Sequence, residues 1–137
     1  MVRVRTYEPE DYAQVKELLI MCGLFDGNFD TEEKFNIKKP KGSIIVAEDN
    51  SRIVGFILFT FDGWDSSIFR LSVHADYRKK GLGVRLLEEA EKRLKKFGAN
   101  ITQLGTKSDE SKLREFYKKN GYGRHSGPFI LMEKKLK

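Results

Sequence analysis

The residues best suited to chemistry lie between positions 71 and 87, where an apolar stretch leads into a basic turn and then an amphipathic helical pattern. The first amides of a helix have no intrahelical partner, and the helix dipole places partial positive charge beside them. Such a junction favours a bound phosphate. Gly81 and Gly83 let backbone N–H groups approach a ligand, and Arg78, Lys79 and Lys80 add positive charge. The same spacing also fits an ordinary turn whose basic side chains face solvent.

Hydrophobic periodicity and turn residues predict the elements around this junction. We expect helices between Pro9 and Gly23 and over residues 32–38, 82–97 and 108–120. Strands are expected over residues 3–7, 43–48, 52–61, 67–73 and 101–106, with one or two more between residues 122 and 136. Thr31 is suited to cap the second helix. Gly55, inside a strand, predicts a bulge or a close approach of another segment.

The composition suits one domain of 137 residues with a real core, because 39% of the residues are hydrophobic and 34% are charged. The chain has no apolar run long enough to cross a bilayer, and its first residues lack a signal-peptide pattern, so we expect a cytoplasmic protein. Cys22 is the only cysteine, which excludes an internal disulfide and a cysteine metal site. We expect it to be packed in the core.

The net charge of +6 fits an anionic ligand such as a coenzyme, and it also fits nucleic acid. Acidic residues interrupt the basic ones, however. In the predicted helix over residues 82–97, three opposite-charge pairs stand at i,i+4 spacing: Glu88 with Lys92, Glu89 with Arg93, and Glu91 with Lys95. Most of this charge is therefore assigned to a solvated helix face, and nucleic acid is disfavoured as a partner.

Three segments, in the right order, resemble the GNAT superfamily of N-acetyltransferases, which bind acetyl-coenzyme A. Residues 78–83 (Arg-Lys-Lys-Gly-Leu-Gly) match the family's Arg/Gln-x-x-Gly-x-Gly/Ala pyrophosphate loop. Residues 4–11 resemble its opening strand and first helix, and residues 113–122 resemble its late helix and the turn after it. The resemblance implies one GNAT acetyltransferase domain over residues 1–137. Its fold would be α+β in α/β/α layers: a mixed, mostly antiparallel sheet of six to seven strands, flanked by about four helices, with a splayed central strand that binds acyl-CoA.

The resemblance also implies the activity: an acetyl-CoA-dependent N-acetyltransferase that moves the acetyl group to a primary amine of an unidentified acceptor, which is a small amine, a peptide or a protein. Acetyl-CoA is the cosubstrate, and no metal is expected. Main-chain groups of the splayed strand would hold the pantetheine arm and the developing oxyanion, and the loop would hold the pyrophosphate. The implied cofactor-binding residues are Leu71, Ser72, Val73, Arg78, Lys79, Lys80, Gly81, Leu82, Gly83, Val84 and Arg85. Tyr117 matches the family's late-helix tyrosine, which the resemblance makes the acid that protonates the leaving thiolate.

The sequence departs from the family pattern at several positions. Many members carry Asn seven residues before that tyrosine, where this chain has Glu110, which we place in the cofactor site on the same grounds. Gly105 and Ser67 stand where two branches of the family carry a catalytic Glu. No general base is therefore identified. The candidates are His74, Asp62, Asp65 and His125, and for His74 we favour a structural role.

Two other functions remain open on the sequence. A non-catalytic acyl-CoA-binding regulatory module would explain the missing base and Glu110. A nucleic-acid-binding domain is supported only by the net charge. The acceptor pocket would lie near the first two helices, where Phe25, Phe29 and Phe35 are candidates to line it. A homodimer is also left open.

Overall fold

The computed structural model describes residues 1–125 and 127–137, which form two compact units, residues 1–104 and residues 105–137. Each unit is described by itself. The first contains four strands, β1 (Arg3–Thr6), β2 (Ile44–Asp49), β3 (Arg52–Phe61) and β4 (Ser66–Val73). Its helices are α1 (Tyr12–Met21), α2 (Glu32–Asn36) and α3 (Leu82–Phe97), with short 3₁₀ turns at Pro9–Asp11 and Ala75–Tyr77.

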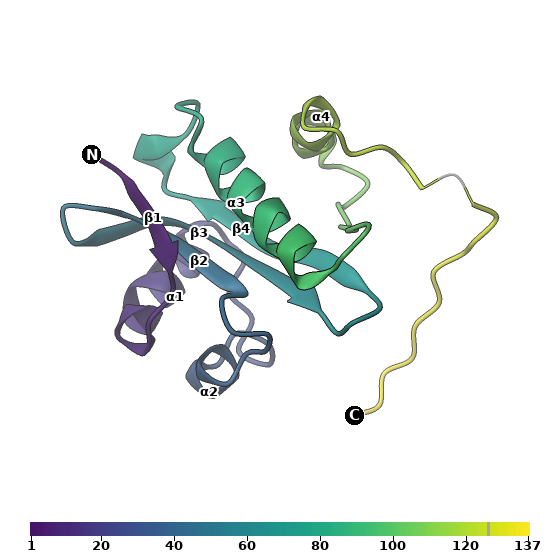
Figure 1. Cartoon of the computed structure of the whole chain (residues 1–137), viewed down its shortest axis with the longest axis horizontal. Coiled ribbons are helices and arrows are strands. Elements are labelled where there is room, and N and C mark those ends of the chain that lie inside the picture. The colour runs from purple at the N-terminus through teal and green to yellow at the C-terminus, as the bar shows by residue number, and fades with distance from the viewer. Residues whose placement is uncertain (126) are drawn as a thin grey trace. The chain divides into compact units, whose positions relative to one another are not determined.

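The four strands form one antiparallel sheet in the order β1-β2-β3-β4, so consecutive strands are neighbours (Figure 1). Two bulges interrupt the register. One lies where Ala47 and Glu48 of β2 face Gly55 and Ile53 of β3, and the other lies between β3 and β4 beside Leu58. A single parallel bridge joins Ser67 to Gln103 at the far edge of β4.

Helices cover both faces of this sheet (Figure 1). On one face, residues of α1 and α2 form a core cluster with alternate residues of the strands. The cluster includes Val15 and Leu18 of α1, Phe35 of α2, and Phe56 and Leu58 of β3. On the other face lies α3, whose buried residues repeat at helical spacing: Leu82, Leu86, Leu87, Ala90 and Leu94. Alternation along β3 separates the two sets, since successive side chains of a strand point to opposite faces.

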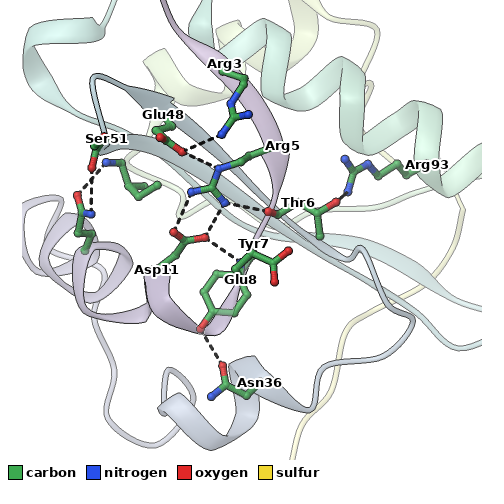
Figure 2. Close-up of polar contacts among 12 residues, drawn as sticks. Arg3, Arg5, Thr6, Tyr7, Glu8, Asp11, Asn36, Glu48, Ser51 and Arg93 are labelled. Atoms are coloured by element: carbon green, nitrogen blue, oxygen red, sulfur yellow. Dashed lines mark hydrogen bonds and ion pairs between the residues drawn. The ribbon is translucent and has the colours of Figure 1, made fainter.

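An ion-pair network ties β1 to the start of α1 (Figure 2). The Arg5 guanidinium donates two hydrogen bonds to the Asp11 carboxylate, at 2.8 and 2.9 Å, and one to Glu48 at 2.6 Å. Asp11 also accepts the Glu8 amide at 2.8 Å. Burial alone would raise the pKa of Asp11, but the bonds from Arg5 and the Glu8 amide outweigh it and lower that pKa.

Local signals explain the helix ends of this unit. The Thr31 hydroxyl accepts the Lys34 amide at 3.2 Å, so the predicted cap of α2 is confirmed. Gly98 ends α3 with φ 107°, a conformation that glycine adopts readily. On the surface of α3 the predicted pair Glu89–Arg93 forms, at 3.6 Å.

The second unit contains one helix, α4 (Ser111–Lys119), among its described residues. It begins after Glu110 and ends at Asn120, followed by Gly121 with φ 93°. The predicted helix start at Ser108 is therefore three residues early. Tyr117 is buried, whereas Leu113, which we expected to point inward, is 36% exposed.

The prediction of six to seven strands is wrong for the described residues, because the sheet has four. The expected strand over residues 101–106 is reduced to the bridge at Gln103. The residues described between 122 and 136 form no strand, and Ser126 lies outside the described residues. Gly121, Gly123, Gly127 and Pro128 fall in or beside this stretch, and glycine and proline disfavour regular strands.

Candidate active site

The strand β4 has an open edge at its C-terminal end. On one side it pairs with β3, where Val73 faces Gly55. On the other side, the Gln103 main chain bonds to the Ser66 carbonyl at 3.1 Å and to the Ile68 amide at 2.9 Å. Beyond Ile68, no strand of the described residues pairs with this edge. Alternate main-chain groups of residues 69–73 therefore point away from the sheet, where an extended ligand can add as a strand does.

A basic turn connects this strand to α3. The 3₁₀ turn at Ala75–Tyr77 is capped by His74, whose Nδ1 accepts the Asp76 amide at 3.1 Å. Tyr77 anchors the turn to the end of β2, because its hydroxyl donates to Asp49 at 2.5 Å. The exposed residues Arg78, Lys79 and Lys80 follow. The turn thus holds three cations on a short, anchored piece of backbone.

The turn ends at the first turn of α3. Lys79 and Gly81 have φ values of 61° and 80°, left-handed conformations that reverse the chain. Gly81 is the N-cap, and its carbonyl accepts the Arg85 amide at 3.1 Å. The amides of residues 82–84 precede that first bond, so the geometry of a helix start leaves them without an intrahelical acceptor. This arrangement fits an anion such as a pyrophosphate.

Gly55 sets the distance between β3 and the start of α3. A Cβ on this residue would lie 3.1 Å from Leu86 Cδ1, 3.2 Å from the Ser72 carbonyl oxygen and 3.4 Å from Leu82 Cδ2. The close approach predicted at Gly55 is confirmed, and a bulge also adjoins it. The missing side chain lets α3, the helix that follows the basic turn, pack closely on β3 next to β4.

The open edge and the basic turn are in contact. The Arg78 Nε donates to the Val73 carbonyl at 3.0 Å, and the Arg78 Nη2 lies 3.6 Å from the Cys22 sulfur. Cys22 is half-buried and packs against the core, close to the expected environment. The sequence pattern does not predict this contact, because Cys22 is distant in the sequence from Val73 and Arg78.

Tyr117 and Glu110 belong to the second unit. Burial, with a contribution from the charge of Glu110, raises the pKa of Tyr117 to about 12. Glu110 accepts the Lys107 amide at 2.9 Å and so closes the turn before α4. Arg114 donates to two carbonyls of the same turn, those of Lys107 and Ser108. The roles of Tyr117 and Glu110 toward a cofactor stay predictions.

Comparison with known proteins identifies the family. The model of the acetyltransferase (GNAT) family matches residues 11–122, which is most of the chain. The chain belongs to the GNAT acetyltransferase family. The expected family is thereby confirmed, and the fold is GNAT-like, with an antiparallel sheet and four helices.

Solved structures share this GNAT fold at low sequence identity. The PaiA N-acetyltransferase from Thermoplasma acidophilum, in complex with coenzyme A, is 22% identical over 90% of each chain, with a TM-score of 0.73. Ard1 from Thermoplasma volcanium is 19% identical over 91% of this chain and 84% of its own, with a TM-score of 0.79. The diaminobutyrate acetyltransferase EctA from Paenibacillus lautus, solved with L-2,4-diaminobutyric acid and coenzyme A, is 18% identical over 88% and 74%, with a TM-score of 0.75.

The candidate bases of this GNAT domain have structural contacts. His74 is 9% exposed, and besides capping the turn its Nε2 lies 2.7 Å from Arg52 Nη2, in agreement with the structural role favoured above. Asp62 accepts the amides of Trp64 and Asp65, which lower its pKa, so it is a turn-forming carboxylate. His125 lies in the second unit, with its ring centroid 5.3 Å from that of Phe129.

The three candidate phenylalanines of the acceptor side differ in burial. Phe35 is in the core at 4% exposure and Phe25 packs partly against it, whereas Phe29 is 54% exposed. Phe29 contacts Phe69 of β4, with ring centroids 6.0 Å apart. Phe29 is thus the most exposed of the three candidates.

A charged pair next to the open edge was not predicted from the sequence. Arg70 of β4 and Asp30, in the loop before α2, form an ion pair at 3.3 Å, and Asp30 is 1% exposed. The signal available in the sequence was the only charged residue inside this strand, Arg70.

Metal ligands and membrane-spanning segments were both considered among the residues that the structure describes. No group of three or more His, Cys, Asp or Glu side chains there could hold a metal ion. None of the helices described is long and apolar enough to span a bilayer.

Proposed function

We propose that this chain is an acetyl-CoA-dependent N-acetyltransferase that acetylates a primary amine. The observation that carries the proposal is the junction in the first unit, where the open edge of β4 leads through a basic turn to the start of α3. Family membership supports it independently. An extended pantetheine arm would add along the edge, and the pyrophosphate would lie at the amides after Gly81.

The reaction would use the same main-chain groups for catalysis. The amine nitrogen attacks the carbon of the thioester carbonyl, and the carbonyl oxygen becomes an oxyanion. The carbon–sulfur bond then breaks, which re-forms a carbonyl in the amide product and releases a thiolate. A main-chain N–H of the segment Leu71–Val73 would stabilise the oxyanion, a contribution of about 2.7–4 kcal/mol for one such donor. The proton lost by the amine leaves through water or an unidentified base.

Tyr117 is proposed to return a proton to the thiolate. A general acid must be protonated at the working pH, and a pKa of about 12 keeps the Tyr117 phenol protonated near neutral pH. Because a phenol of this pKa is a weaker acid than an ordinary thiol, whose pKa is about 8.5, the equilibrium of this transfer favours the thiolate. The step would therefore go forward as coenzyme A leaves and water returns a proton to the phenoxide. Glu110 would contribute by holding the turn at the start of α4.

The nucleic-acid alternative receives less support. Several arginines that would have to contact phosphates are paired with carboxylates instead, among them Arg3 and Arg5 with Glu48, Arg70 with Asp30, and Arg93 with Glu89. The basic turn is a short local cluster of the kind that suits a single pyrophosphate.

The proposed reaction is tested with isotopically labelled acetyl-CoA and a panel of amines, amino acids, peptides and proteins, read by mass spectrometry. We expect one acceptor class to gain the labelled acetyl group, with one coenzyme A released per transfer. Coenzyme binding without transfer to any acceptor would contradict the enzyme and support the regulatory module.

A further inference from the structure

Two buried polar atoms on the α1 face of β4 have no hydrogen-bond partner. Among the described residues, the Arg70 Nε and the Ser72 Oγ are the only fully buried side-chain nitrogen or oxygen atoms without a hydrogen-bond partner. Buried polar groups are nearly always paired, so each exception asks for an explanation such as a missing ligand. The two residues are two positions apart on one strand, and both face the core side because their partners across β3 are Leu58 and Phe56.

The Arg70 guanidinium is held in a fixed orientation. Its Nη2 donates to the Asp30 carboxylate at 3.3 Å. Asp30 in turn accepts the Asp26 amide at 2.8 Å, and its carbonyl accepts the Tyr12 hydroxyl at 2.5 Å. The loop between α1 and α2 is thus built around this carboxylate. A guanidinium fixed on one side, with an unused Nε–H on another, is preorganised to donate to an oxygen of a ligand.

Apolar rings border the same guanidinium. The Arg70 Cζ lies 4.5 Å from the centroid of the Phe69 ring, and Phe69 contacts Phe29. Both rings are partly exposed, Phe69 at 41% and Phe29 at 54%. The Arg70 side chain is itself 17% exposed, so part of it reaches the surface beside the Phe69 ring while its Nε stays buried. Because the Arg70 Nε and the Ser72 Oγ are buried, a ligand would reach them only when neighbouring side chains move. It would then present an oxygen to the strand and an apolar group to the rings.

We infer that Arg70 and Ser72 recognise a carboxylate of the acceptor, which makes the acceptor a small amino carboxylate with an apolar side chain. The inference rests on the proposed function, because it is the acetyl transfer at the neighbouring main chain of Leu71–Val73 that calls for an acceptor at this place. A carboxylate has acceptor sites for both donors, the guanidinium Nε–H and the Ser72 hydroxyl. A charge-assisted bond to a guanidinium is also stronger than a bond from a neutral donor.

The test uses product analogues, in which the amine is already acetylated and its own pKa plays no part. N-acetyl-L-phenylalanine and N-acetyl-L-phenylalaninamide differ only in carboxylate against amide, and N-acetylglycine lacks the apolar side chain. Each is titrated into the full chain by calorimetry, with and without coenzyme A. We expect the acid to bind at least 10-fold more tightly than the amide and than N-acetylglycine, as one charge-assisted hydrogen bond or one buried ring supplies.

Two variants separate recognition from structure. Ser72→Ala removes a hydroxyl that has no partner, so the melting temperature should be unchanged or higher while the acid loses about 3- to 10-fold in affinity. Arg70→Lys keeps the positive charge beside Asp30, lacks the Nε–H, and should reduce the preference for acid over amide. The matched control is Ser66→Ala on the same strand. The Ser66 hydroxyl donates to Thr102 at 2.8 Å, so this change should lower the melting temperature and leave the affinity for the acid unchanged.

The titrations test carboxylate recognition and the proposed function by different readouts. Equal binding of acid and amide, or no binding of either at millimolar concentration, would overturn carboxylate recognition. Equal binding of N-acetylglycine would overturn the apolar part of it. Failure of the proposed function is read in the same titrations, as absence of coenzyme A binding. The preference between acid and amide is then still measured in the chain without coenzyme A.

Discussion

The Arg78 guanidinium donates to the Val73 carbonyl at 3.0 Å, so the first cation of the basic turn occupies the open edge of β4. In the proposed function the same carbonyl accepts from the pantetheine arm, and the same guanidinium is attracted to phosphate. We therefore expect binding of the coenzyme to draw Arg78 from the Val73 carbonyl toward the phosphates.

This exchange predicts opposite effects of Arg78→Ala on two ligands. Acetyl-pantetheine has no phosphate, so it should bind a few-fold more tightly to the variant, because the Val73 carbonyl is free. Acetyl-CoA should bind about 2- to 5-fold more weakly, because a cation near its phosphates is lost. Calorimetry on both ligands checks this. The control Lys96→Ala removes an exposed cation from the last turn of α3 and should move neither affinity. Parallel changes for both ligands in Arg78→Ala would contradict the exchange.

Gly55→Ala tests the contact that positions α3. The new Cβ would lie 3.1 Å from Leu86 Cδ1 and 3.2 Å from the Ser72 carbonyl oxygen, tighter than ordinary packing. We expect the variant to lose about 1–3 kcal/mol of unfolding free energy, the usual cost of overpacking, with weaker binding of acetyl-CoA. Denaturant unfolding measures the first and calorimetry the second. Gly27→Ala is the control, since its Cβ would meet no atom within 4 Å. Wild-type stability of Gly55→Ala would show that α3 is not held at this distance.

The Arg5–Asp11 pair predicts a pH-dependent part of the stability. Burial raises the pKa of Asp11, but the hydrogen bonds from Arg5 and the Glu8 amide leave it lowered on balance. A carboxyl whose pKa is lower in the folded state stabilises above its unfolded pKa, about 3.9, and loses that effect as the pH falls through the folded value.

Asp11→Asn should therefore cost roughly 2–4 kcal/mol at pH 7, because it breaks a nearly buried pair, and much less near pH 2–3. Urea unfolding at several pH values gives the difference. Glu89→Gln, which breaks a pair on the surface of α3, should cost less than about 0.5 kcal/mol at pH 7. If the cost of Asp11→Asn did not change with pH, the carboxylate would not be the source of this stability.

Tyr117→Phe distinguishes an acid from a packing residue. Loss of the hydroxyl should lower kcat by roughly 10²–10⁴-fold if it protonates the thiolate, and should change stability by no more than about 0.5–1.5 kcal/mol. Because the pKa of Tyr117 is about 12, the wild-type kcat should show no alkaline loss from this residue between pH 7 and 10. Tyr122→Phe, its ring neighbour at 5.5 Å, is the control and should retain kcat. An unchanged kcat for Tyr117→Phe, with a loss of stability, would make water the proton source.

The parts of the fold that follow from local patterns were predictable. The helix α3 follows from its apolar repeat and Gly98, and the cap at Thr31 follows from residue type. The position of the basic turn before α3 was predictable for the same reason, since its cations and glycines lie in one short run of sequence. The Gly55 contact was half predictable, because a glycine inside a strand signals a close approach without naming the partner.

What was missed depends on contacts between distant segments. The pairs Arg78–Val73 and Arg70–Asp30 join residues whose proximity is set by the packing of β4 against α1 and the following loop. The number of strands was overestimated because it followed the family resemblance and the apolar run over residues 129–132, while pairing requires a partner edge that the sequence does not specify. Unpaired buried atoms such as the Ser72 Oγ are visible only when every neighbour is placed.

The central claim is that acetyl-CoA binds at the junction of β4, the basic turn and α3. Calorimetric titration of acetyl-CoA into wild type and Gly83→Val tests it most directly, with thermal unfolding and circular dichroism on the same samples. We expect wild type to bind with measurable heat and to gain about 2.7 kcal/mol of stability at a ligand concentration 100 times Kd. Gly83→Val should keep the native spectrum, since valine is no worse than glycine in a helix, and should lose affinity because its side chain crowds the pyrophosphate. Absence of heat and of a thermal shift in wild type, or equal affinity in Gly83→Val, would contradict the account.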